Sequence, residues 1–138
     1  MAERPRILVI DDDEDVQILL KTGLGGLGFK VETADSGMMG LASLLQFLPD
    51  MILLDMEMPD MDGLTFLKRR NEFNALKAIP VIIVSAKGMN SDVAASLDAG
   101  ANYYITKPFE LHHLNLAITR FLARRRPSTP NETTQVYW

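Results

Sequence analysis

The sequence predicts an α/β fold in which five parallel strands form one doubly wound sheet with helices on both faces. Five short runs rich in apolar residues recur along the 138 residues, at 6–10, 29–34, 51–55, 80–85 and 102–106. Most of them are nearly continuous, which is typical of strands buried on both faces of a parallel sheet. A segment with helical spacing follows each run, and right-handed crossovers then place helices on both faces of the sheet.

The first two strand–helix units span residues 6–47. After the strand at 6–10 we expect a helix whose apolar face consists of Val16, Leu19, Leu20, Leu24 and Leu27. The strand at 29–34 alternates apolar and polar residues, and a shorter helix at 36–47 follows it. Asp35 or Ser36 is the expected N-cap of that helix, because a side-chain oxygen there can accept a backbone N–H of the first turn.

The last three units span residues 51–124. The strand at 51–55 precedes a helix with Leu64, Phe66, Leu67 and Phe73 on its apolar side, and the strand at 80–85 precedes a short helix at 91–98 with Ser91 as its N-cap. The strand at 102–106 precedes the clearest stripe, which Pro108 opens and which consists of Leu111, Leu114, Ala117, Ile118, Phe121 and Leu122.

We therefore expect one domain at 5–124 and a polar tail or linker at 125–138. The tail closes with Val136, Tyr137 and Trp138, which either dock on the domain or begin an output element.

Composition excludes several classes of function. The chain has no cysteine, which excludes a disulfide framework, a thiolate nucleophile and a cysteine-based zinc site. The net charge of −4 argues against direct nucleic-acid binding, and we expect Arg124–Arg126 to favour the dipole of a helix end instead. No apolar run approaches the ~20 residues of a membrane helix. Aspartates follow the N-terminus too soon for a secretory signal, so we expect a cytoplasmic protein with no membrane partner.

Two motifs suggest ligands but have the wrong context. Gly23, Gly25 and Gly28 match the dinucleotide fingerprint G-x-G-x-x-G, which binds a pyrophosphate only where it follows a strand and opens a helix. Here the glycines close a helix, so Gly28 is expected to be its cap. The adjacent His112 and His113 point about 100° apart on a helix and cannot chelate one ion together.

The residues that indicate chemistry follow the predicted strands. Ligands of a doubly wound parallel sheet bind beyond the carboxyl ends of its strands. The side chains expected at that edge are Asp11, Asp12 and Asp13 after the first strand, Asp35 after the second, Asp55 after the third, Ser85 at the end of the fourth, and Thr106 and Lys107 at the end of the fifth. Capping of the next helix remains an alternative role for Asp11 or Asp13.

Such a cluster of acids requires a cation or a proton. Two carboxylates about 4 Å apart repel by roughly 4 kcal/mol at an effective dielectric constant near 20. All candidate ligands are oxygens, which selects a hard ion, and a site with few carboxylates and room for a phosphate suits Mg²⁺ better than Ca²⁺. A magnesium-bound carboxylate beside Lys107 and Ser85 is equipped to accept a phosphoryl group as an acyl phosphate.

Four segments, "ILVIDDDED", "DMILLDMEMPDMDG", "PVIIVSA" and "AGANYYITKPF", resemble the receiver domains of two-component response regulators. The resemblance runs from about residue 5 to 124, with each motif on its expected strand. It implies a flavodoxin-like (βα)5 fold with strand order 2-1-3-4-5. It also implies a signalling function, in which a sensor histidine kinase or a histidine phosphotransfer protein donates a phosphoryl group in a Mg²⁺-dependent reaction.

The resemblance further implies a role for each site residue. Asp55 is the expected phosphoacceptor. The expected Mg²⁺ ligands are Asp12, Asp55 and the backbone carbonyl of Glu57, with Asp11 reaching the ion through water. Lys107, ahead of a cis peptide to Pro108, pairs with the phosphoryl group, Ser85 is the switch hydroxyl and Tyr104 the switch aromatic. Asp60 and Asp62 are expected to serve the turn into the next helix.

Phosphorylation is expected to draw Ser85 toward Asp55 and to let Tyr104 turn inward. The face formed by the helix at 91–98, the strand at 102–106 and the last helix would then change shape for a downstream protein target. A homodimer that forms on phosphorylation is a further partner allowed by the resemblance. We also expect Glu57 and Lys87 to form an ion pair over the pocket that slows attack by water.

The domain is not expected to be an enzyme beyond catalysing its own phosphorylation and dephosphorylation. A stand-alone receiver is the favoured organisation. The alternatives are the N-terminal receiver of a longer DNA-binding regulator and a phosphorylation-independent interaction module on the same fold.

Overall fold

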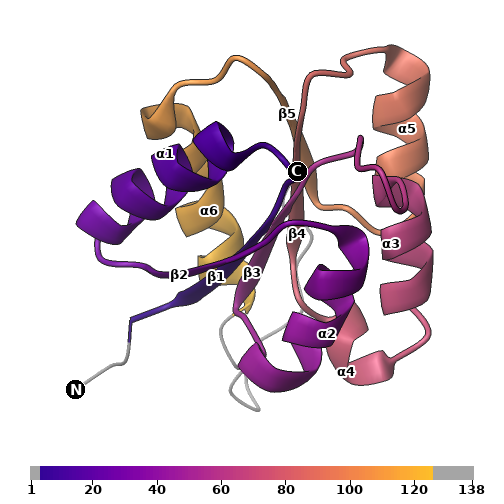
Figure 1. Cartoon of the computed structure of the whole chain (residues 1–138), viewed down its shortest axis with the longest axis horizontal. Helices are drawn as coiled ribbons and strands as arrows, with labels where there is room; N and C mark the ends of the chain where they lie inside the picture. Colours follow the sequence, from indigo (N-terminus) through magenta and orange to yellow (C-terminus); the bar gives the residue numbers. More distant parts are fainter. Residues whose placement is uncertain (1–3, 126–138) are drawn as a thin grey trace.

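Five parallel strands form one sheet in the order β2-β1-β3-β4-β5 (Figure 1). The computed structural model describes residues 4–125. The strands are β1 (Arg6–Ile10), β2 (Lys30–Ala34), β3 (Met51–Leu54), β4 (Val81–Ser85) and β5 (Tyr103–Thr106), and every neighbouring pair is parallel. Each strand begins and ends within one residue of its predicted limits. The doubly wound fold and the strand order are therefore confirmed.

Helices cover both faces of the sheet (Figure 1). They are α1 (Glu14–Gly26), α2 (Gly37–Phe47), α3 (Gly63–Arg70), α4 (Asn74–Lys77), α5 (Asn90–Asp98) and α6 (Leu111–Arg125). α1 and α6 pack on one face, and α2, α3 and α5 lie on the other. The short α4, just before β4, was not predicted.

Alternation along each strand divides the core into two layers. In β1, Ile7 and Val9 pack with the α1 and α6 side, whereas Leu8 and Ile10 pack with the α2 and α3 side. All four of these side chains are buried. Burial on both faces explains why the strand reads as an uninterrupted apolar run.

The predicted apolar faces of two helices are partly wrong. In α1, Leu20 and Leu24 are buried, but Leu19 is 52% exposed and Leu27 is 51% exposed. Leu27 lies at the C-cap, where the helix ends, and only a narrow stripe of α1 meets the sheet and α6. Phe73 is 54% exposed because α3 ends at Arg70.

Helix ends confirm some predicted caps and correct others. The Ser36 hydroxyl accepts a hydrogen bond from the Met39 N–H at 3.1 Å, so Ser36 is the N-cap of α2. Gly28 has φ of 101° just beyond the end of α1, which confirms its capping position. Ser91 is not a cap, since α5 begins one residue earlier with Met89 at its N-cap.

Pro108 lies outside α6. The helix begins at Leu111, so the prediction that Pro108 opens its first turn is wrong. The Lys107–Pro108 peptide is cis, as expected. The predicted stripe of α6 is confirmed, with Leu114, Ile118 and Phe121 buried. His112 and His113 are both exposed.

The predicted tail is not part of this description, because residues 126–138, with Val136, Tyr137 and Trp138, lie outside the described residues. Among residues 4–125, none of the helices has the length and apolar character required to cross a membrane.

Candidate functional site

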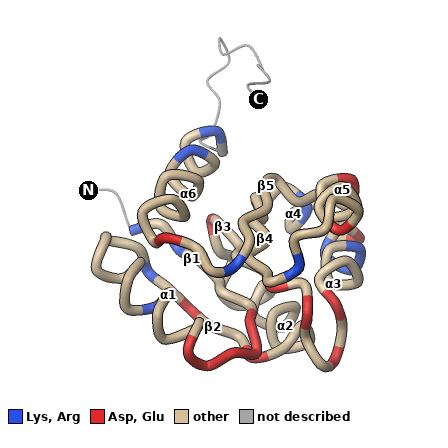
Figure 2. Tube along the Cα trace, turned by 90° about the horizontal axis from the view of Figure 1, so that it is seen from above, with Lys and Arg blue, Asp and Glu red and all other residues tan. Residues whose placement is uncertain are grey.

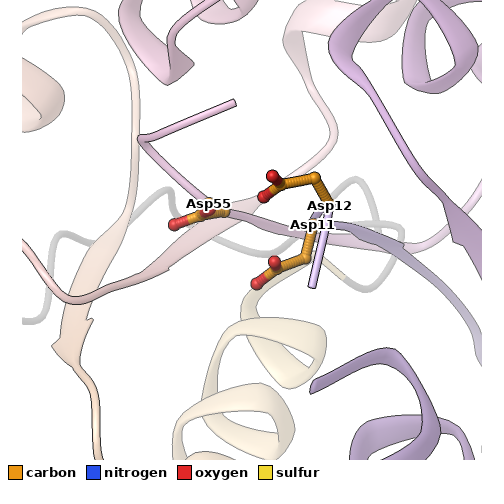
Figure 3. A group of neighbouring side chains, drawn as sticks. All are labelled: Asp11, Asp12 and Asp55. Carbon is orange, nitrogen blue, oxygen red and sulfur yellow. The ribbon is translucent and has the colours of Figure 1, made fainter. Parts of the chain in front are cut away.

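Three aspartates meet at the carboxyl ends of two neighbouring strands. Asp11 and Asp12 follow β1, and Asp55 follows β3 (Figure 3). One carboxylate oxygen from each residue lies within 4.8 Å of the others. Acidic positions are frequent in the loops at this end of the sheet (Figure 2). The sequence prediction that these residues converge is therefore confirmed.

Backbone hydrogen bonds fix the two buried members of this group. The Asp11 N–H donates to the Ala34 carbonyl at 3.1 Å, and the Asp55 N–H donates to the Ile10 carbonyl at 2.9 Å. Both bonds continue the ladders of the sheet, so each side chain leaves a rigid strand end. Asp11 is 2% exposed and Asp55 is 6% exposed, whereas Asp12 is exposed.

Asp13 has a different role from its neighbours. Its carboxylate accepts hydrogen bonds from the backbone N–H groups of Asp15 at 2.9 Å and Val16 at 3.4 Å, which makes it the N-cap of α1. Asp11 is not the cap; its Oδ1 accepts the Asp13 N–H at 2.9 Å. Asp13 thus orders the turn that presents Asp11 and Asp12.

Within the described part of the chain, Lys107 is the only lysine whose ammonium group forms ion pairs at this edge of the sheet. Its Nζ lies 2.8 Å from Asp11 Oδ2 and 3.8 Å from Asp55 Oδ1. Three carboxylates against one ammonium leave an excess of negative charge. All of the negative groups are oxygen donors, so the group could hold a hard divalent cation.

The pKa values of Asp55 and Lys107 reflect burial and the charges around them. Burial, and next the charge of Asp11, raise the pKa of Asp55 from 3.8 to about 6, against the opposing effects of Lys107 and the Glu57 N–H. Burial by itself would lower the pKa of Lys107, but its hydrogen bond to Asp11 and the charges of Asp11 and Asp55 raise it. Lys107 therefore stays charged, and Asp55 is mostly ionised at neutral pH.

Ser85 and Tyr104 meet at the loop after β4. Ser85 is fully buried, and its Oγ accepts the Lys87 N–H at 3.2 Å. The Tyr104 hydroxyl donates to the Lys87 backbone carbonyl. Burial raises the pKa of Tyr104, while a hydrogen bond with Ser85 acts in the opposite direction. Because β3 and β4 are neighbours with Leu54 opposite Ile83, Ser85 lies near the level of Asp55.

The expected ion pair between Glu57 and Lys87 is not present. The ion pairs recorded between residues 4 and 125 both involve Lys107. Lys87 acts instead as a minor cause of the lowered pKa of Asp62, after the Thr65 N–H and hydroxyl. Glu57 has an exposed side chain, and its backbone N–H helps to hold the charge on Asp55.

The two aspartates of the β3–α3 loop (residues 56–62), Asp60 and Asp62, have different hydrogen-bond partners. Asp62 is the N-cap of α3 and accepts the Thr65 N–H at 2.8 Å, as expected. Asp60 is not a cap of α3, although, after the Met38 N–H, the N–H groups of Asp60 and Met61 in its own loop contribute to lowering its pKa. Its carboxylate accepts the N–H groups of Gly37 at 3.1 Å and Met38 at 2.8 Å, at the start of α2.

Gly63 allows the loop to close. The Gly63 N–H donates to the Met56 carbonyl at 2.9 Å. A Cβ at this position would lie 2.5 Å from Met56 Sδ and 3.0 Å from Met56 Cα, so no side chain fits without displacing the backbone next to Asp55.

Gln17 is a site residue that sequence reasoning missed. Its Nε2 donates to the Asp11 carbonyl at 2.6 Å and to Asp35 Oδ1 at 2.9 Å, which ties the end of β1 to the end of β2. Asp35 therefore helps to hold the ends of β1 and β2 together, and it is not one of the carboxylates that could bind a metal ion. A polar residue in the first turns of an amphipathic helix gives no signal of such a role.

A groove of about 840 Å³ opens beside β5 and α6. Its lining includes aromatic and charged side chains, among them Tyr103, Tyr104, Phe109, Arg120 and Phe121. This groove occupies part of the face on which a downstream partner is expected.

Comparisons with known proteins agree with this geometry. The family model described as the response regulator receiver domain matches residues 7–119. The transcriptional regulatory protein PrrA of Mycobacterium tuberculosis is 41% identical over 135 residues, which cover 95% of this chain and 55% of PrrA. The DNA-binding dual master transcriptional regulator RpaA of Synechocystis is 38% identical over 126 residues, or 91% of this chain and 52% of RpaA. This chain thus spans about half the length of these curated relatives.

A solved structure agrees as well. The receiver domain of the Francisella response regulator 1452 superposes with a TM-score of 0.83 at 30% identity, covering 89% of this chain and 100% of that domain.

Proposed function

Because this chain belongs to the response regulator receiver domain family of two-component systems, we propose that Asp55 accepts a phosphoryl group from a sensor histidine kinase or a histidine phosphotransfer protein. The observation that carries the proposal is the meeting of Asp11, Asp12 and Asp55 with Lys107 at one edge of the sheet. Acids alone are common in loops, but this group adds a cation within 3.8 Å of the acceptor oxygen.

The residues of the site supply a nucleophile and a positive charge. A carboxylate oxygen of Asp55 attacks phosphorus, the bond from phosphorus to the donor nitrogen breaks, and an acyl phosphate forms. A pKa of about 6 leaves the oxygen ionised at neutral pH. The ammonium of Lys107, held by Asp11 at 2.8 Å, lies where charge on the transferred group can be compensated.

The donor set fits Mg²⁺, because it contains oxygens and neither sulfur nor imidazole. Asp12, Asp55 and the backbone carbonyl of Glu57 would hold the ion, with Asp11 acting through water. When bound, the ion would neutralise charge on the phosphoryl oxygens. This domain would catalyse only its own phosphorylation and dephosphorylation.

Ser85 and Tyr104 would carry the signal to the face formed by α5, β5 and α6. The Ser85 hydroxyl would donate to a phosphoryl oxygen on Asp55, and Tyr104 is already joined to the same loop through the Lys87 carbonyl. To shift the loop from a 1:99 to a 99:1 ratio of two conformations, the phosphoryl group must favour one conformation by about 5.5 kcal/mol. The groove beside β5 and α6 would then bind a downstream target or a second copy of the chain.

The experiment is incubation with acetyl phosphate and Mg²⁺, followed by intact-mass measurement. The chain is expected to gain the mass of one phosphoryl group, and a chelator should prevent the gain. Asp55→Asn should remain unmodified, whereas Asp98→Asn, an exposed aspartate at the end of α5, should react normally. Modification of Asp55→Asn would refute the assignment of Asp55 as the acceptor. No modification of the wild type would refute the proposal and favour a phosphorylation-independent interaction module.

A second candidate concerns the output. The relatives PrrA and RpaA are transcriptional regulators, and this chain spans about half of each. That observation favours a receiver that controls transcription. Reading the gene past codon 138 tests it: a DNA-binding domain in the same frame supports this output, and a stop codon overturns it in favour of a stand-alone receiver.

A further inference from the structure

The β3–α3 loop is tied to the start of α2 by a carboxylate. The two oxygens of Asp60 accept the N–H groups of Gly37 at 3.1 Å and of Met38 at 2.8 Å. These groups belong to the first turn of α2, where no carbonyl of the helix can reach them. Ser36 caps the same turn from within the helix, through the Met39 N–H. α2 therefore has two capping side chains, and only one of them comes from the loop.

A second contact lies next to the first. A Cβ at Gly37 would lie 2.3 Å from Met61 Cγ, so the Met61 side chain rests directly on the backbone of α2. Met58, which precedes both anchors, is buried. Consecutive parts of the loop are thus held by α2 and by the core.

The contacts of Asp60 and Met61 with α2 affect Glu57, because Glu57 lies in the chain between Asp55 and the part of the loop that these contacts hold. The side chain of Glu57 is exposed and takes part in no recorded ion pair within residues 4–125. The Asp55 N–H is fixed by Ile10, and the Gly63 N–H by Met56. Between those two points, the Ser96 hydroxyl of α5 donates to Met56 Sδ at 3.6 Å, before Glu57, whereas the two hydrogen bonds of Asp60 join the part of the loop after Glu57 to α2.

We propose that Asp60 is a positioning residue, which holds the β3–α3 loop against α2 so that the Glu57 carbonyl is available to the metal site of Asp12 and Asp55. The inference rests on the proposed function, because it assigns Asp60 a role in metal binding. A carboxylate suits the position because its two oxygens can accept two N–H groups, and negative charge is favoured at a helix N-terminus. The Met38 N–H is the main cause of a lowered pKa of Asp60, so the group remains ionised.

The test compares two variants that each remove a hydrogen-bond acceptor from the same helix end. Asp60→Ala releases the loop, whereas Ser36→Ala weakens the first turn of α2 and leaves the loop attached. Calorimetric titration with MgCl₂ is expected to show an affinity about tenfold weaker for Asp60→Ala, the low end of the loss for an outer partner of a metal ligand. Ser36→Ala is expected to match the wild type.

Three further readouts separate positioning from simple helix capping. Both variants should unfold at a lower temperature than the wild type without Mg²⁺, but only Asp60→Ala should shift the backbone amide signals of Glu57 and Met58. Asp60→Asn, which keeps one acceptor oxygen, should recover part of the Mg²⁺ affinity. Saturating Mg²⁺ should restore phosphorylation of Asp60→Ala by acetyl phosphate to near the wild-type rate.

Equal Mg²⁺ affinities for Asp60→Ala and the wild type would overturn the inference, as would an equal loss in Ser36→Ala. If Asp60→Ala does not fold, the comparison of Asp60→Asn with Ser36→Ala decides in the same way. A wild type that binds no Mg²⁺ would overturn the proposed function and this inference together. If the wild type binds Mg²⁺ and Asp60→Ala binds it equally well, this inference is overturned and the proposed function stands.

Discussion

Replacement of the acceptor, Asp55→Asn, is expected to stabilise the metal-free protein. Asp55 is 6% exposed, and burial together with Asp11 raises its pKa from 3.8 to about 6. One pKa unit corresponds to about 1.4 kcal/mol, so the fold disfavours the ionised carboxylate by roughly 3 kcal/mol. Water that reaches the open edge of the sheet reduces this to about 2 kcal/mol. Asparagine has nearly the same shape and no charge, so the variant should recover that free energy at neutral pH.

The sign of the pH dependence follows from linkage. A carboxyl group with a raised folded-state pKa binds its proton more tightly in the folded protein, so it stabilises the fold below about pH 4. That stabilisation is lost as the pH rises through about 6 in the wild type. Asp55→Asn does not titrate at this position. The difference in unfolding free energy between variant and wild type should therefore be small near pH 4 and reach about 2 kcal/mol above pH 7.

The assay is urea unfolding followed by circular dichroism, with a chelator present, at about pH 4.5 and about pH 7.5. The gain at the lower pH should be less than half of the gain at the higher pH. Asp98→Asn, which replaces an exposed aspartate, controls for the loss of one negative charge and should change stability little. Excess Mg²⁺ should reduce or reverse the difference, because the ion would stabilise the wild type by mass action.

Two results would refute this reasoning. One is an Asp55→Asn variant that is no more stable than the wild type at about pH 7.5 without metal. The other is a gain that is the same at both pH values, because the cost of burying the charge and the repulsion from Asp11 both disappear when Asp55 is protonated.

Three further substitutions should change stability in the same unfolding assay. Gly63→Ala should cost about 1–3 kcal/mol, because the new methyl group would overlap Met56, including its Cα at 3.0 Å; unchanged stability would show that the loop can yield. Asp62→Ala should cost about 1 kcal/mol through loss of the α3 N-cap, and a wild-type midpoint would contradict that role. Arg70→Ala should cost at least about 2 kcal/mol, because the buried guanidinium donates to three backbone carbonyls, at Leu76, Lys77 and Ile79. An Arg70→Ala variant as stable as the wild type would contradict this role.

Local pattern was sufficient for the strands and for the acids that follow them. A strand covered on both faces must be apolar at nearly every position, so its limits are visible without knowledge of its neighbours. Once the strands are parallel, their carboxyl ends share an edge, and the strand order, which the resemblance implied, brings Asp11, Asp55 and Lys107 together there.

The exposure and the hydrogen-bond partners of individual side chains could not be predicted from the local sequence. Leu19 has the helical spacing of a core residue, yet it is 52% exposed because the width of the stripe depends on what packs against α1. Arg70 has the composition of a surface residue, yet it is 1% exposed and satisfies the carbonyls around α4. Neither fact can be read from neighbours along the chain.

The sequence by itself determined the order of the elements, the edge at which the chemistry lies and the type of atoms gathered there, because each depends on periodicity or on residue type. Only the tertiary structure decided the partners of particular side chains. Asp60 shows the difference, since its acceptor role concerns N–H groups 22 and 23 residues earlier in the chain. Contacts over such separations arise when α2 and the β3–α3 loop pack on the same face of the sheet, and packing of that kind leaves no periodic trace in the residues that make it.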